Sequence, residues 1–132
     1  METAESEEVI KRRVERAFGR DARLRNRGQL QEMRDHGRKA VGKTCVVIAL
    51  EAPPDGSRRA AFLISRKYSL LAVDRNRARR LFRETYRRLY ERLPQVWLLF
   101  IPRHRIRDAK QDEVQLEVES LLAQLGITLE TV

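Results

Sequence analysis

The chain has 132 residues, a formal net charge of +9 and a sequence pI of about 10.5. This length suits one domain with a modest core, and the charge favours a polyanionic partner. The single cysteine excludes an intrachain disulfide, and no apolar run is long enough to span a membrane. Since the acidic N-terminus also has no signal-peptide pattern, we expect a cytoplasmic protein that is not attached to a membrane.

The predicted elements follow one another without an internal repeat or a linker. Residues 1–22 are a charged N-terminal extension, which is either a helix or a tail. A short helix is expected over 26–36, ended by a glycine. Strands are expected over 43–50 and 60–65, and the turn between them is rich in Pro and Gly.

Residues 74–92 contain no Pro or Gly, and their apolar residues recur at helical spacing. We therefore expect an amphipathic helix of about five turns. Asp74 suits its N-cap, where a carboxylate accepts a backbone N–H and favours the positive end of the helix dipole. A strand over 96–101, a basic loop over 103–107 and a last helix over 110–125 complete the chain. The predicted domain is 23–126, and 127–132 is a C-terminal tail.

Many cations of the central helix lie on one broad face. Only Glu84 and Glu91 follow Asp74 as acids within the helix, so most of its arginines lack a local ion-pair partner. A solvated surface is the plain alternative. Unpaired arginines favour RNA or DNA instead, because the planar guanidinium binds phosphate through two parallel hydrogen bonds and stacks on bases.

The central helix and the strand before it carry a family resemblance. The strand ends in LISRK at 63–67, and the helix opens with VDRNRARRLFR at 73–83. This order resembles the protein subunit of bacterial ribonuclease P, which has a Ser-[Lys/Arg]-Lys strand end and an R-N-R-x-[K/R]-R-x-x-R signature. Further matching segments lie before and after these two, so the resemblance covers about residues 23–122.

The resemblance implies an α+β fold, a two-layer sandwich in the order αβββαβα. The helices would cover one face of the sheet, and the arginine helix would form a left-handed βαβ crossover, as in a ribosomal protein. The implied function is to bind a catalytic RNA and precursor tRNA, and to assist the Mg²⁺-dependent endonucleolytic removal of the 5′ leader. Because the RNA would hold the Mg²⁺ and perform the chemistry, we predict that this chain has no catalytic residue, metal ligand or cofactor of its own.

The residues predicted to bind RNA lie on the arginine helix and at the end of the preceding strand. They are Arg66, Lys67, Arg75, Asn76, Arg77, Arg79, Arg80, Arg83 and Arg87. A cleft between the first helix and the sheet would hold the leader. Its candidate residues are Leu30, Arg34, Ile48, Phe62 and Ile64, with an ordinary core position as the alternative for the apolar ones.

Aromatic residues usual in the family are absent at three cleft positions, which here are Leu30, Arg34 and Ile48. Aliphatic side chains offer no π-face, so stacking on leader bases should be weaker. Two other functions stay open: a structured-RNA or ribosome-associated protein without a catalytic RNA, and a non-specific DNA-binding protein. The DNA alternative is less favoured, because an arginine row at i+4 spacing follows phosphates better than base edges.

Overall fold

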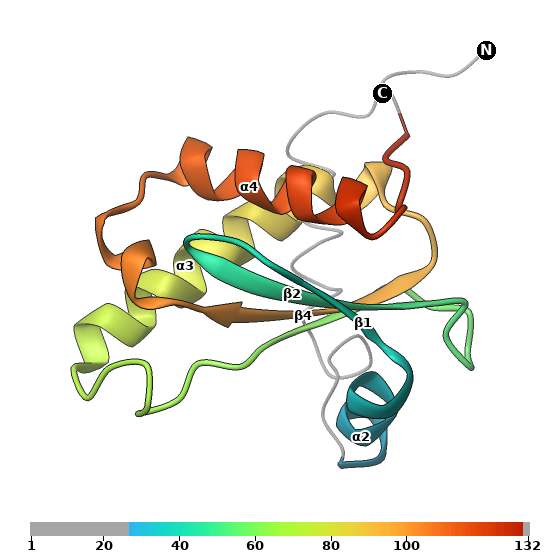
Figure 1. The fold of residues 1–132 in the computed structure, drawn as a ribbon, viewed down its shortest axis with the longest axis horizontal. Helices are drawn as coiled ribbons and strands as arrows, with labels where there is room; N and C mark the ends of the chain where they lie inside the picture. Colours follow the sequence, from blue (N-terminus) through green and yellow to red (C-terminus); the bar gives the residue numbers. More distant parts are fainter. Residues whose placement is uncertain (1–26, 131–132) are drawn as a thin grey trace.

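The computed structural model describes residues 27–130, so the predicted extension 1–22 lies outside the described residues. The elements are α2 (Arg27–His36), β1 (Arg38–Val41), β2 (Cys45–Glu51), β3 (Arg59–Phe62), α3 (Ala72–Leu89), the 3₁₀ helix η1 (Tyr90–Arg92), β4 (Val96–Pro102), the 3₁₀ helix η2 (His104–Asp108) and α4 (Gln111–Gln124). This order of helices and strands confirms the predicted αβββαβα arrangement (Figure 1). None of the described helices combines the length and the apolar character needed to cross a bilayer.

The strands form one four-stranded sheet in the order β1-β2-β4-β3. β2 pairs antiparallel with β1 and with β4, whereas β3 and β4 run parallel. Parallel neighbours need a crossover connection, and α3 provides it. The crossover around the arginine helix is therefore present, and its left-handed sense stays a prediction from the resemblance.

The helices cover both faces of the sheet. α3 and α4 lie on one face and α2 lies on the other (Figure 1). Along β4, Leu98 and Phe100 join the core beneath α3 and α4, whereas Trp97 and Leu99 pack with Met33 of α2. The prediction that all helices share one face is thus wrong for α2. The physical reason is that β4 is a continuous apolar run, and such a strand needs cover on both faces.

The larger core is aromatic where α3 crosses the sheet. Phe82 of α3 stacks on Phe100 of β4 with ring centroids 5.4 Å apart, and Phe62 of β3 lies 5.7 Å from Phe100. These contacts fix α3 over the centre of the sheet. Its opposite side, which carries Arg79, Arg80 and Arg83, is therefore held toward solvent.

α3 begins two residues earlier than predicted. It starts at Ala72, so the prediction of Asp74 as N-cap is wrong. Asp74 lies in the first turn instead, where it accepts a hydrogen bond from Ser69 Oγ at 2.9 Å and pairs with Arg107 at 3.4 Å. An acid in the first turn still interacts favourably with the helix dipole.

The chain is tightly packed after α2 and at its C-terminal side. Gly37 closes α2, and a Cβ at this position would collide with the carbonyl oxygen of Met33 and with the side chain of Ile48. At the other end, Ile127 and Leu129 pack against the larger core. The packed region thus extends past residue 126, and the predicted tail begins with residues that belong to the domain.

Candidate nucleic-acid interface

Four predicted RNA-binding residues form one exposed surface on α3. We call Asn76, Arg79, Arg80 and Arg83 the arginine face. They lie opposite the buried positions of α3, such as Ala78 and Phe82. Arg79 Nη1 donates a hydrogen bond to Asn76 Oδ1 at 3.1 Å, which keeps the amide and the guanidinium together at the surface. The structure therefore presents several cations along one rigid helix.

Two other signature arginines turn inward to the protein's own backbone. Arg77 is half-buried and donates from Nη1 to the carbonyl oxygen of Ile106 at 2.8 Å, and from Nη2 to that of Ala109 at 2.5 Å. Arg75, also half-buried, donates to the carbonyl oxygen of Ser69 at 2.9 Å. In this structure both arginines hold segments that flank α3.

Arg87 lies in an ion-pair cluster. Its side chain is 13% exposed, and Nη2 is 2.5 Å from Glu84 Oε1, which also accepts from Arg88 Nε at 3.1 Å. The hydrogen bond from Arg87 is the main cause that holds the pKa of Glu84 below its usual range. The prediction that these arginines lack local partners is therefore wrong for Arg87 and Arg88.

The predicted leader-cleft residues do not line one cleft. Leu30 and Ile48 lie in the cluster between α2 and the sheet, and Arg34 is exposed on α2. Phe62 and Ile64 pack on the other face, against the α3 and α4 core. Strand alternation is the reason, since Phe62 shares the parity of the inward side of β3. For these two residues the cleft prediction is wrong, and they are core residues.

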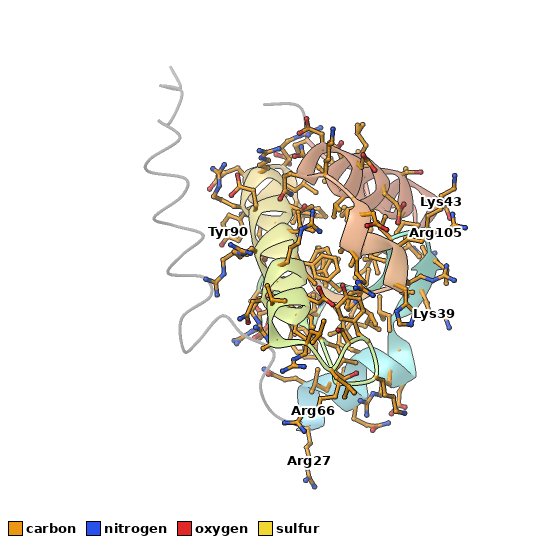
Figure 2. All side chains as sticks on the ribbon, turned by 90° about the vertical axis from the view of Figure 1, so that its left-hand side faces the viewer. Arg27, Lys39, Lys43, Arg66, Tyr90 and Arg105 are labelled. Atoms are coloured by element: carbon orange, nitrogen blue, oxygen red, sulfur yellow. The ribbon has the colours of Figure 1, made fainter. Side chains whose placement is uncertain are left out.

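A groove of about 920 Å³ lies where β1 and β4 end and where the chain leaves β3. We call it the strand-end groove. Its lining residues are Val41, Gly42, Lys43, Leu63, Ser65, Lys67, Tyr68, Ile101, Pro102, Arg103, His104 and Arg105. Figure 2 looks onto this end of the molecule, with Lys43 and Arg105 labelled at the same edge. Cations therefore surround a floor that is partly apolar.

Lys67 is the predicted RNA-binding residue that lines this groove. Arg66 is exposed and is labelled toward the α2 end of the view in Figure 2. Lys43, Arg103 and Arg105 were not among the predicted site residues, although the basic loop over 103–107 was a signal. The basic loop alone does not predict a groove, because the sequence does not show that this loop faces the β1–β2 turn.

The turn that carries Lys43 is fixed from two sides. Glu117 of α4 accepts hydrogen bonds from Thr44 N at 2.8 Å, Thr44 Oγ1 at 2.9 Å and Cys45 N at 3.2 Å. Arg103 Nη1 donates to the carbonyl oxygen of Gly42 at 2.6 Å. Burial and the negative charge of Glu117 raise the pKa of Cys45 to about 12, so the thiol stays neutral. The groove wall is thus held by Glu117 of α4 and by Arg103, which follows β4.

A family model described as Ribonuclease P matches residues 18–126. The chain belongs to the ribonuclease P protein family. A ribonuclease P protein component from Symbiobacterium thermophilum is 32% identical over 106 residues, which cover 80% of this chain and 91% of the relative. The match confirms the resemblance found in the sequence and extends it at both ends.

Solved ribonuclease P proteins share the fold. The Staphylococcus aureus RNase P protein superposes with a TM-score of 0.71 at 19% identity, covering 83% of this chain and 99% of that one. The Thermotoga maritima protein gives a TM-score of 0.66 at 23% identity, covering 77% and 96%. RNA binding and tRNA processing are the activities expected of this ribonuclease P family.

Proposed function

We propose that this chain is the protein subunit of a ribonuclease P holoenzyme. It binds the catalytic RNA through the arginine face and the 5′ leader of precursor tRNA through the strand-end groove. By doing so it assists the Mg²⁺-dependent endonucleolytic removal of the leader, which matures the tRNA 5′ end in the cytoplasm. The observation that carries the proposal is the arginine face, because it presents the outward half of the family signature on a rigid helix.

The arginine face suits a folded RNA. Arg79, Arg80 and Arg83 are exposed along one side of α3, whose position is fixed by buried aromatic contacts. Guanidinium groups bind phosphate through two parallel hydrogen bonds, and each contact releases counterions from the RNA. A rigid row of such groups would lower the repulsion between the phosphates of the catalytic RNA and those of the substrate.

The strand-end groove suits a single strand. Lys43, Lys67 and Arg105 are exposed at its rim, while Leu63 and Ile101 contribute apolar surface. Proteins that bind unpaired RNA combine cations along the backbone with surfaces for the bases. The leader of a precursor tRNA is such a strand, and it would enter the groove beside the docked catalytic RNA.

The chemistry would belong to the RNA. Within residues 27–130, His, Cys, Asp and Glu side chains form no group of three that could hold a metal ion. In the proposed holoenzyme the Mg²⁺ ions would be held by the catalytic RNA. The protein would bind and orient the RNA and lower charge repulsion through its exposed cations.

A structured-RNA protein without a catalytic RNA is the second candidate. The aliphatic side chains of Leu30 and Ile48 favour it, because they offer no π-face between α2 and the sheet for leader bases. It would use the same arginine face. The two candidates differ in whether cleavage of precursor tRNA depends on the protein.

The test is leader cleavage by the organism's own ribonuclease P RNA at low Mg²⁺, with and without the full chain. The proposal expects the protein to restore cleavage and to have no activity without the RNA. The matched control is the variant Arg79→Glu with Arg80→Glu, which should fold and fail to restore cleavage. If the wild-type chain binds structured RNA tightly and leaves the cleavage rate unchanged, the second candidate replaces the first.

A further inference from the structure

Two aromatic rings lie against each other in the strand-end groove. The rings of Tyr68 and His104 have centroids 6.0 Å apart and planes inclined by 27°. Tyr68 is only 8% exposed and belongs to the larger core, whereas His104 is exposed. Both line the groove. The buried phenol thus supports an imidazole that is open to solvent.

The backbone at Tyr68 and around His104 is fixed by hydrogen bonds to other parts of the fold. Tyr68 N donates to the carbonyl oxygen of Ser65 at 3.1 Å, which closes the turn before α3. His104 is the first residue of η2, whose end is held by the two hydrogen bonds from Arg77. On its other side, Arg103 N donates to the carbonyl oxygen of Thr44 at 2.9 Å. The protein's own hydrogen bonds therefore hold the two segments that bring the rings together.

The surroundings of the pair define the ligand's chemistry. Lys43, Lys67 and Arg105 line the same groove, so an anion can lie beside the rings. The groove volume of about 920 Å³ falls within the range of about 300–1,000 Å³ for sites that enclose small organic groups. A ligand that combines a planar ring with phosphates would fit both the rings and the cations, and a nucleotide has this combination. In an unpaired nucleotide the base is free to stack.

We propose that Tyr68 and His104 form a stacking platform for one unpaired base of single-stranded RNA. This inference rests on the proposed function and specifies how the groove would bind the leader. The base would lie on the exposed imidazole, and its flanking phosphates would lie near Lys43 and Lys67. The platform supplies π-faces at the strand ends, whereas the positions on α2 and β2 carry Leu30 and Ile48.

The test uses the full chain assembled with its catalytic RNA, and it measures affinity for a precursor tRNA and for the mature tRNA. His104→Ala should weaken precursor binding about five- to tenfold and leave mature tRNA binding unchanged, as expected for the loss of one stacked base. His104→Phe should restore the affinity. Lys39→Ala is the matched control, because Lys39 is exposed on β1 and is not among the residues that line the groove, and it should behave as wild type.

A second arm identifies the base. Precursor tRNAs with one abasic nucleotide at successive leader positions are bound by the wild type and by His104→Ala. One position should cost the wild type about five- to tenfold and cost His104→Ala nothing further. Two results would overturn the platform while the proposed function stands. In one, His104→Ala binds the precursor as tightly as the wild type does. In the other, no abasic position weakens binding by the wild type without also weakening binding by His104→Ala. A wild-type chain that does not bind the catalytic RNA overturns both.

Discussion

Arg77 should stabilise the fold more than it binds RNA, although it lies in the middle of the signature. The perturbation is Arg77→Met, which keeps the length of the apolar stem and removes the two hydrogen bonds to the carbonyl oxygens of Ile106 and Ala109. Hydrogen bonds to charged groups contribute about 1.5–3 kcal/mol each. Because Arg77 is only half-buried and water can reach part of the site, we expect a total loss of about 2–3 kcal/mol.

The matched control is Arg79→Met, which removes an exposed guanidinium with one hydrogen bond to Asn76 at 3.1 Å. Its effect on the free energy of unfolding should stay within about 0.5 kcal/mol. The single tryptophan, Trp97, is 3% exposed and reports unfolding by fluorescence. With an m-value of about 1–1.5 kcal/mol/M, the urea midpoint of Arg77→Met should fall by roughly 2 M.

RNA binding should show the opposite order. Arg79→Met should reduce affinity for the catalytic RNA and lower the salt dependence by about one phosphate contact. Folded Arg77→Met, measured well below its urea midpoint, should bind more nearly as wild type. If Arg77→Met keeps the wild-type midpoint and loses as much RNA affinity as Arg79→Met, Arg77 contacts RNA and the assignment to η2 is wrong.

Three further predictions concern charge. Arg79→Glu with Arg80→Glu should leave the urea midpoint unchanged and abolish binding of the catalytic RNA in a filter assay; unchanged affinity would exclude the arginine face as the docking surface. Glu117→Ala should cost about 1–3 kcal/mol, because it leaves backbone N–H groups of the β1–β2 turn without their acceptor. It should also speed alkylation of buried Cys45 by a thiol reagent. An unchanged labelling rate would contradict the role of Glu117 in holding this turn. Glu84 has a lowered pKa, so the unfolded chain binds more protons in the acid range. Its stabilisation is present above the ordinary carboxyl pKa and is lost as the pH falls through the folded-state pKa. The thermal midpoint of Glu84→Gln should therefore fall less than that of wild type between about pH 6 and about pH 3, and equal slopes would contradict the shift.

Most elements were predictable because the local patterns are strong; β1 (Arg38–Val41) is the exception, since it lies outside the strand ranges predicted from the residues and was implied only by the resemblance. The helical spacing from 74 to 92 and the apolar run from 96 to 101 gave α3 with η1 and β4 nearly to the residue. The same apolar run also indicated that both faces of this strand are buried. The prediction of helices on one face of the sheet overlooked this indication. The face of Phe62 depended on strand parity, and parity is set by the register with β4.

The roles of individual arginines were not predictable from the helix alone. Arg77 and Arg79 look alike in the sequence, and they differ because η2 meets one and not the other. The strand-end groove is assembled from three segments around residues 41–43, 63–68 and 101–105. No local pattern connects these segments, so a basic loop was visible and its partner surface was not.

Within residues 27–130, α3 carries the arginine face and also holds two segments that line the strand-end groove. The outward residues of α3 form the arginine face, while Arg75 and Arg77 fix the backbone before α3 and the end of η2. These are the two segments that contribute Tyr68 and His104 to the strand-end groove. Residues of one short signature thus serve two purposes: Arg75 and Arg77 position the protein's own backbone, and Arg79, Arg80 and Arg83 are exposed to solvent. Through Arg77, the helix that carries the arginine face also holds η2, and η2 contributes His104 to the strand-end groove.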